Sequence, residues 1–121
     1  MSEKLKVLIV DDSNMIVKTI QKHLSKYDID IVGSANDGKT ALEVFKKTSP
    51  DIVTLDITMP EMDGLTVLEK MLEINNEAKI IIITALNDKI TKINAIKMGA
   101  KAFLDKPFTE ERLSEVMEDI L

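Results

Sequence analysis

Five short apolar runs alternate along this chain with five segments that have the periodicity of amphipathic helices. The apolar runs lie near residues 5–10, 29–33, 51–55, 79–83 and 101–104, and the helical patterns lie near 13–26, 37–48, 64–74, 87–98 and 109–120. Short runs rich in β-branched residues and bounded by polar residues predict buried strands. Regular alternation of strands with helices predicts one parallel sheet covered by helices on both faces. The expected fold is therefore an α/β, doubly wound (βα)5 domain.

The runs also differ in a way that predicts their places in the sheet. Residues 80–83 are four isoleucines without polar alternation, which is typical of a central strand buried on both faces. Residues 28–31 read Asp-Ile-Asp-Ile and alternate, which indicates an edge strand. Helix ends are marked as well, because Ser13, Asp37 and Thr109 are suitable N-caps and Gly99 is a suitable left-handed C-cap.

Length and composition narrow the class of protein. The 121 residues fit one domain, and the last helical pattern ends at Leu121, so residues 1–121 are expected to form a single domain without an output domain. The net charge of −5 argues against a nucleic-acid surface, which needs a basic patch. No run approaches the roughly 18 apolar residues of a membrane span, and the N-terminus lacks the apolar stretch of a signal peptide. These features predict a cytoplasmic protein without membrane insertion.

Some chemistry is excluded by the residues that the chain lacks. There is no cysteine, which excludes disulfides, thiolate catalysis and cysteine-based zinc sites. His23 is the only histidine, so a metal site built on a histidine pair is also excluded.

Three aspartates follow two of the apolar runs directly. Asp11 and Asp12 follow the first run, and Asp56 follows the third. In open α/β sheets, ligands bind in the crevice at the carboxyl ends of the strands, where these three carboxylates would meet. Crowded carboxylates repel one another, and a hard divalent cation such as Mg²⁺ relieves that repulsion. The sequence therefore predicts metal-assisted chemistry directed at phosphate.

Two further residues fall on the same edge. Thr84 follows the fourth run and Lys106 follows the fifth, and a hydroxyl and an ammonium can hold the oxygens of a phosphoryl group. Taken alone, Asp11 or Asp12 could be a helix cap, and Lys106 could be a solvated surface lysine. The joint placement at four strand ends favours a common site.

With these residues in place, the chain resembles the receiver domain of two-component response regulators over essentially its whole length. Within that family it is most similar to the single-domain chemotaxis regulators. The matching stretches are residues 7–13, 51–56, 59–64, 83–85, 98–100 and 105–108. The resemblance implies a flavodoxin-like five-stranded sheet of order 2-1-3-4-5.

The resemblance also implies a role for each site residue. Asp56 would be the phosphoacceptor nucleophile, attacking a phosphohistidine of a sensor histidine kinase. Asp12 and Asp56 would ligate Mg²⁺ together with the backbone carbonyl of Thr58, and Asp11 would orient a metal-bound water. The chain would thus catalyse its own phosphorylation and autodephosphorylation, and would act chiefly as a signalling switch.

The remaining residues would bind the phosphoryl group or respond to it. Lys106, before a frequently cis proline bond, would pair with the phosphoryl oxygens, and Thr84 would hydrogen-bond to one of them. Thr84 and Phe103 would form the switch, the alternative for Phe103 being an ordinary strand aromatic packed on the core. Leu86 and Thr58 would border the path of the hydrolytic water, although Leu86 could instead be a helix-entry residue packed away from the site.

The expected partners of this monomer are a sensor histidine kinase and a target such as a flagellar motor switch component. A phosphorelay role, passing the phosphoryl group to a histidine phosphotransferase, is the alternative. Three other classes fit less well. A flavodoxin-like electron carrier would have a Ser/Thr-rich phosphate loop after the first strand, and an aspartate-nucleophile phosphatase would have its nucleophile there. A structural adaptor would be expected to lack one of the five site residues.

Overall fold

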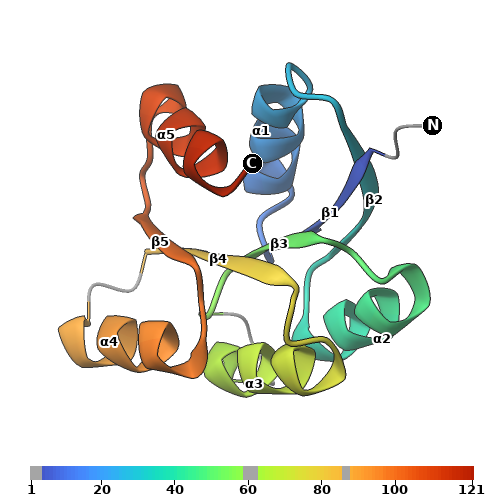
Figure 1. The fold of residues 1–121 in the computed structure, drawn as a ribbon. Coiled ribbons are helices and arrows are strands. Elements are labelled where there is room, and N and C mark those ends of the chain that lie inside the picture. The colour runs from blue at the N-terminus through green and yellow to red at the C-terminus, as the bar shows by residue number, and fades with distance from the viewer. Residues whose placement is uncertain (1–3, 59–62, 86–87) are drawn as a thin grey trace.

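A single parallel sheet lies between two layers of helices (Figure 1). The structure is a computed structural model that describes residues 4–58, 63–85 and 88–121. The elements alternate as β1 (Leu5–Val10), α1 (Asn14–Leu24), β2 (Ile29–Ala35), α2 (Gly38–Thr48), β3 (Ile52–Leu55), α3 (Gly64–Ile74), β4 (Lys79–Thr84), α4 (Lys89–Met98), β5 (Ala102–Asp105) and α5 (Glu110–Ile120). The strand order is β2-β1-β3-β4-β5 and each pair is parallel, which confirms the predicted fold.

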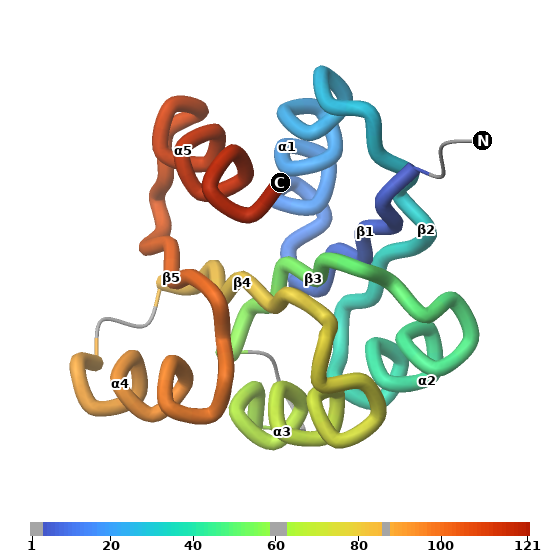
Figure 2. Tube along the Cα trace, viewed as in Figure 1, coloured from blue at the N-terminus to red at the C-terminus, as the bar shows by residue number. Residues whose placement is uncertain are grey.

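Each face of the sheet has its own apolar core, because side chains alternate between the two faces along a strand. Helices α1 and α5 cover one face, and α2, α3 and α4 cover the other (Figures 1 and 2). The core under α1 and α5 is made by Val7, Ile9, Val17, Ile20, Leu24, Ile52, Ile81, Ile83, Leu104, Leu113 and Met117. The opposite core includes Leu8, Val10, Phe45, Val53, Leu55, Val67, Leu68, Met71, Ile80, Ile82 and Ala95.

The places predicted for individual strands are confirmed. Every residue of β4 except Lys79 is buried, as expected of a strand covered on both faces. β2 lies at the edge of the sheet and stays mostly half-exposed. The register pairs Val10 of β1 with Leu55 of β3, so the residues that follow these two leave the sheet side by side.

The predicted helix caps are present. The side chains of Ser13, Asp37 and Thr109 accept hydrogen bonds from the first turns of α1, α2 and α5. Gly99 ends α4 at φ 119°, a left-handed conformation that favours glycine. No helix in the described ranges is both long and apolar enough to cross a membrane.

Candidate functional site

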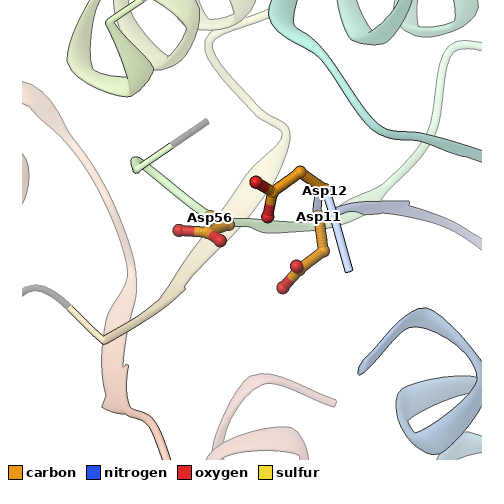
Figure 3. A group of neighbouring side chains, drawn as sticks. All are labelled: Asp11, Asp12 and Asp56. Carbon is orange, nitrogen blue, oxygen red and sulfur yellow. The ribbon is translucent and has the colours of Figure 1, made fainter. Parts of the chain in front are cut away.

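Asp11, Asp12 and Asp56 meet at the carboxyl edge of the sheet (Figure 3). Each contributes a carboxylate oxygen, and these three oxygens all lie within 4.8 Å of one another. Asp11 and Asp56 are buried, with only 1% and 2% of their surface exposed, whereas Asp12 is exposed. The predicted cluster therefore forms, with two carboxylates inside the protein and one facing solvent.

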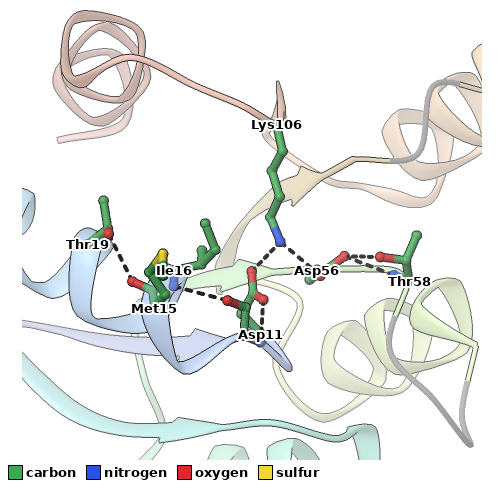
Figure 4. Close-up of polar contacts among 8 residues, drawn as sticks. Asp11, Met15, Ile16, Thr19, Asp56, Thr58 and Lys106 are labelled. Carbon is green, nitrogen blue, oxygen red and sulfur yellow. Dashed lines mark hydrogen bonds and ion pairs between the residues drawn. The ribbon is translucent and has the colours of Figure 1, made fainter.

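Lys106 places its ammonium between the two buried carboxylates (Figure 4). Its Nζ lies 2.6 Å from Asp11 Oδ2 and 3.0 Å from Asp56 Oδ2. The end of β5 is fixed beside β4, because the Lys106 N–H donates to the Thr84 carbonyl at 2.9 Å. The Lys106–Pro107 peptide bond is cis, as the resemblance implies. In this structure, the single positive charge of Lys106 thus offsets part of the negative charge of the two buried carboxylates.

Short turns after β1 and β3 hold the two carboxylates in place. The Ser13 N–H donates to Asp11 Oδ1 at 2.9 Å. The Thr58 N–H and hydroxyl both donate to Asp56 Oδ1, at 2.9 and 2.7 Å. The two backbone contacts each join a carboxylate to the N–H two residues on, which is an Asx turn. Both carboxylates therefore have a fixed orientation before any ligand arrives.

The pKa values of the two buried carboxylates, Asp11 and Asp56, are shifted in opposite directions. Burial raises the pKa of Asp11 above its ordinary value, and the Lys106 and Ser13 contacts only partly offset this. Burial also acts to raise the pKa of Asp56, but the two Thr58 hydrogen bonds and the Lys106 ammonium together hold it below the ordinary value. Burial would lower the pKa of Lys106, yet its contacts with both carboxylates raise it. Asp56 is therefore the better stabilised anion of the pair.

The donor set fits a hard divalent cation. Carboxylate oxygens are the ligands that Mg²⁺ takes in proteins, usually one or two of them together with water. The exposed Asp12 carboxylate has neither a hydrogen bond nor an ion pair within the part of the chain described. An oxygen donor that is free and faces solvent beside Asp56 is what a cation arriving from solution requires.

Thr84 and Phe103 belong to β4 and β5, the two strands that follow β3 in the sheet. Thr84 is the last residue of β4 and is fully buried. Phe103 pairs with Ile82, is partly buried and packs against the core shared with α4. The predictions for Leu86 and for Met59–Met62 fall outside the described residues.

The structure also adds contacts that sequence reasoning missed. The Thr58 hydroxyl holds Asp56, and the Asp-x-Thr spacing could have indicated this turn. Gly64 opens α3 against the segment after Asp56, where an added Cβ would lie 2.2 Å from the Ile57 Cα. Asp88 caps α4 by accepting from the Ile90 N–H at 3.0 Å.

Comparison with known proteins agrees with this geometry. Residues 7–118 match the family described as the response regulator receiver domain. The chemotaxis protein CheY of Bacillus subtilis is 41% identical over 96% of this chain and 97% of its own length. The CheY protein of Listeria monocytogenes is 44% identical over 94% of this chain and 96% of its own length.

Comparison with solved structures also finds receiver domains of response regulators. The chain has a TM-score of 0.91 and 36% identity to a Borrelia burgdorferi CheY in a CheX–CheY–BeF3–Mg²⁺ complex, covering 96% of this chain and 88% of that one. It has a TM-score of 0.90 and 31% identity to the receiver domain of AraT from Geobacillus stearothermophilus, covering 98% and 93%. The chain therefore belongs to the response regulator receiver domain family and is most similar to the single-domain, CheY-like chemotaxis regulators.

Proposed function

We propose that this protein is a phosphorylation-activated switch in which Asp56 accepts a phosphoryl group from a phosphohistidine of a sensor histidine kinase, in a reaction that depends on Mg²⁺. The observation that carries the proposal is the site of Asp56, which is a buried, preoriented carboxylate beside two other carboxylates and a lysine ammonium. Carboxylates in such settings act as nucleophiles in covalent phosphoryl transfer.

Different residues of the chain have different roles in the phosphoryl transfer. An Asp56 oxygen forms a bond to phosphorus while the bond from phosphorus to the histidine nitrogen breaks and that nitrogen keeps the electron pair. The Thr58 hydrogen bonds hold the carboxylate during the attack. The Lys106 ammonium, already 3.0 Å from Asp56, then pairs with the oxygens of the phosphoryl group, and Thr84 donates a hydrogen bond to one of them.

The metal would be held by the residues of the cluster. Asp12, Asp56 and the backbone carbonyl of Thr58 would ligate it, and Asp11 would orient a water molecule in its coordination shell. When bound, Mg²⁺ supplies neutralisation of the negative charge that gathers around the phosphoryl group. The Ser13 N–H holds the Asp11 carboxylate in the orientation that this role needs.

The signal is read at the surface made by α4, β5 and α5. Thr84 and Phe103 lie on β4 and β5, and Lys106 directly follows β5, so contacts made by the phosphoryl group there shift the position of this surface between two states. A hollow of about 540 Å³ opens on it, with Ile93, Ile96 and Phe103 in its wall and with three lysines and two aspartates among its lining residues. It suits an apolar partner segment that carries acidic residues, such as one from a flagellar motor switch component.

The relatives support this assignment. The Borrelia structure pairs a CheY with BeF3, Mg²⁺ and CheX, so a similar chain binds a phosphoryl mimic, the metal and a protein partner. The matched relatives from Bacillus and Listeria are chemotaxis proteins of nearly the same length. We infer a cytoplasmic, monomeric receiver domain that acts by binding a separate protein.

Labelling by a small phosphodonor tests the chemistry. With acetyl phosphate and Mg²⁺, the protein should gain one acid-stable, base-labile phosphoryl group, and Asp56→Asn or chelation of the metal should abolish it. Asp63→Asn is the matched control, because Asp63 is an exposed carboxylate that caps α3 and asparagine also caps helices. Undiminished labelling of the Asp56 variant would refute the proposal.

Chemical-shift mapping with Mg²⁺ and beryllofluoride tests the signalling surface. Changes should gather on α4, β5 and α5 beyond the site itself. Changes confined to α2 and α3 would contradict the assignment of the surface. Binding of a histidine phosphotransferase, with transfer of the phosphoryl group to it, would favour a phosphorelay role over a motor target.

A further inference from the structure

The geometry points to Lys92 as a latch on Phe103, the aromatic residue of the proposed switch. We propose that the Lys92 ammonium holds the Phe103 ring in its position in this structure, and that this contact is lost when the protein is activated. The inference rests on the proposed function and names a positioning residue that controls it.

The contact itself is direct. Lys92 Nζ lies 5.1 Å from the centroid of the Phe103 ring, within the range of a cation–π attraction. Phenylalanine has no hydroxyl, so a cation over the face of the ring is the strongest polar contact that this side chain can make. Within the described ranges, Lys92 forms no ion pair, although Asp88 and Asp105 line the same hollow. The Asp88 carboxylate instead accepts hydrogen bonds from the Ile90 N–H and the Thr91 hydroxyl.

The Phe103 ring has space to move, and helix α4 beside it has few buried residues, so a contact between them can affect the position of the ring. Phe103 and Lys92 both line the hollow between α4 and β5, so the ring has open space beside it. Helix α4 is held weakly, since Ala95 is its only buried residue and Ile90, Ile93 and Ile96 are exposed. The cation–π contact between α4 and β5 therefore adds to the packing of Ala95 and Met98 in keeping the ring and the helix in this arrangement.

The contact between Lys92 and Phe103 determines which state is favoured when the lysine is replaced. A contact present in one state and absent from the other stabilises the first state by the free energy of that contact. Loss of the Lys92 charge should therefore favour the activated state. An exposed cation–π contact corresponds to an affinity change of about two- to fivefold.

The test is the affinity for beryllofluoride at constant Mg²⁺ in four proteins. Lys92→Met keeps a linear apolar side chain but removes the cation, and should bind beryllofluoride about two- to fivefold more tightly than the wild type. Lys92→Arg keeps the attraction to the ring and should match the wild type. Lys89→Met is the matched control, because Lys89 lines the same hollow and its loss changes the net charge equally.

A second readout follows the ring directly. Protein labelled with 4-fluorophenylalanine gives one fluorine resonance for each of the three phenylalanines, and Phe103→Leu identifies that of Phe103. This resonance should move in unliganded Lys92→Met and stay in place in Lys89→Met. Equal beryllofluoride affinities for the two methionine variants would overturn the latch. If the wild type binds no beryllofluoride, the proposed function fails, and an unmoved Phe103 resonance in Lys92→Met then overturns the latch independently.

Discussion

The interior of the sheet and its carboxyl edge are built by the same strands and have opposite chemistry. One residue separates them, since Val10 and Leu55 are fully apolar core residues and their successors Asp11 and Asp56 are buried carboxylates. In the interior, burial of apolar side chains stabilises the fold. At the edge, burial disfavours the charged carboxylates, and the Lys106 ammonium offsets this only in part.

This difference implies that stability and chemistry can be perturbed separately. Variants in the interior should unfold the protein without changing the reactivity of the fraction that stays folded. Variants at the edge should change the binding of metal and phosphoryl groups, with smaller effects on folding.

The largest effect is expected in the interior. Ile81 lies in the middle of β4 and is fully buried, so Ile81→Ala should lower the free energy of unfolding by about 2–5 kcal/mol through lost burial and a cavity. Urea unfolding measures this. Labelling of the folded protein by acetyl phosphate should persist. A decrease in the free energy of unfolding well below that range would show that packing of β4 contributes little to the stability of the core.

Gly64 connects the two regions. Gly64→Ala should lower the free energy of unfolding by about 1–3 kcal/mol, because the new Cβ overlaps the Ile57 backbone. The displaced segment carries Thr58, so the affinity for Mg²⁺ should fall too, which titration at constant ionic strength would measure. Unchanged metal affinity in the folded variant would show that this close approach does not position the site.

At the edge, Lys106→Met leaves two close carboxylates without their cation. In metal-free buffer, we expect the free energy of unfolding to fall by about 1–3 kcal/mol, because the buried carboxylates lose their charged partner. Added Mg²⁺ should stabilise this variant more than the wild type, because it binds only the folded cluster tightly. Lys101→Met, at the exposed opposite end of β5, is the control and should change neither quantity. Equal stabilisation of Lys106→Met and wild type by Mg²⁺ would contradict the role of Lys106 as the resident cation.

Thr54 is a polar residue in the interior, and it sharpens the comparison. Its register with Ile9 and Ile81 turns it toward the core under α1 and α5. Among residues 4–58, 63–85 and 88–121, its hydroxyl has no hydrogen-bond partner. Thr54→Val should therefore raise the free energy of unfolding by about 1 kcal/mol. Thr54→Ser retains the hydroxyl and loses a methyl group, so it should lower the stability. A destabilised valine variant would mean that the hydroxyl is paired in solution.

The dependence of stability on pH separates the two buried carboxylates. The folded-state pKa of Asp56 is lowered, so its stabilising contribution is present above the unfolded pKa and is lost as pH falls through the folded value. The folded-state pKa of Asp11 is raised, so this residue reduces stability above that value and stops doing so on acidification. Asp56→Asn should flatten the acid limb of a urea-midpoint profile and Asp11→Asn should steepen it. Identical profiles would refute these directions.

Much of the architecture could be predicted because its causes are local. The alternation of apolar runs gave the strands, and Ser13, Asp37, Thr109 and Gly99 mark helix ends through contacts within a turn. The clustering of the aspartates also followed from the pattern, since parallel strands end at a common edge. These inferences need the order of residues and no side-chain packing.

Other features depend on contacts between distant residues. The sequence placed Lys106 at the edge, but its closer approach to Asp11 than to Asp56 depends on how β1, β3 and β5 are arranged. The close approach of Gly64 to the Ile57 backbone depends on how α3 docks. The position of Lys92 over Phe103 depends on how α4 lies against β5.

The central claim is that Asp56 carries the phosphoryl group, and chemical trapping tests it most directly. An aspartyl phosphate is an acyl phosphate, which borohydride reduces to homoserine. After treatment with acetyl phosphate and Mg²⁺ and then with borohydride, peptide mass spectrometry should find homoserine at position 56, and none when the metal is chelated. Homoserine at Asp11 or Asp12, or phosphorylated protein that yields no homoserine at position 56, would contradict the account.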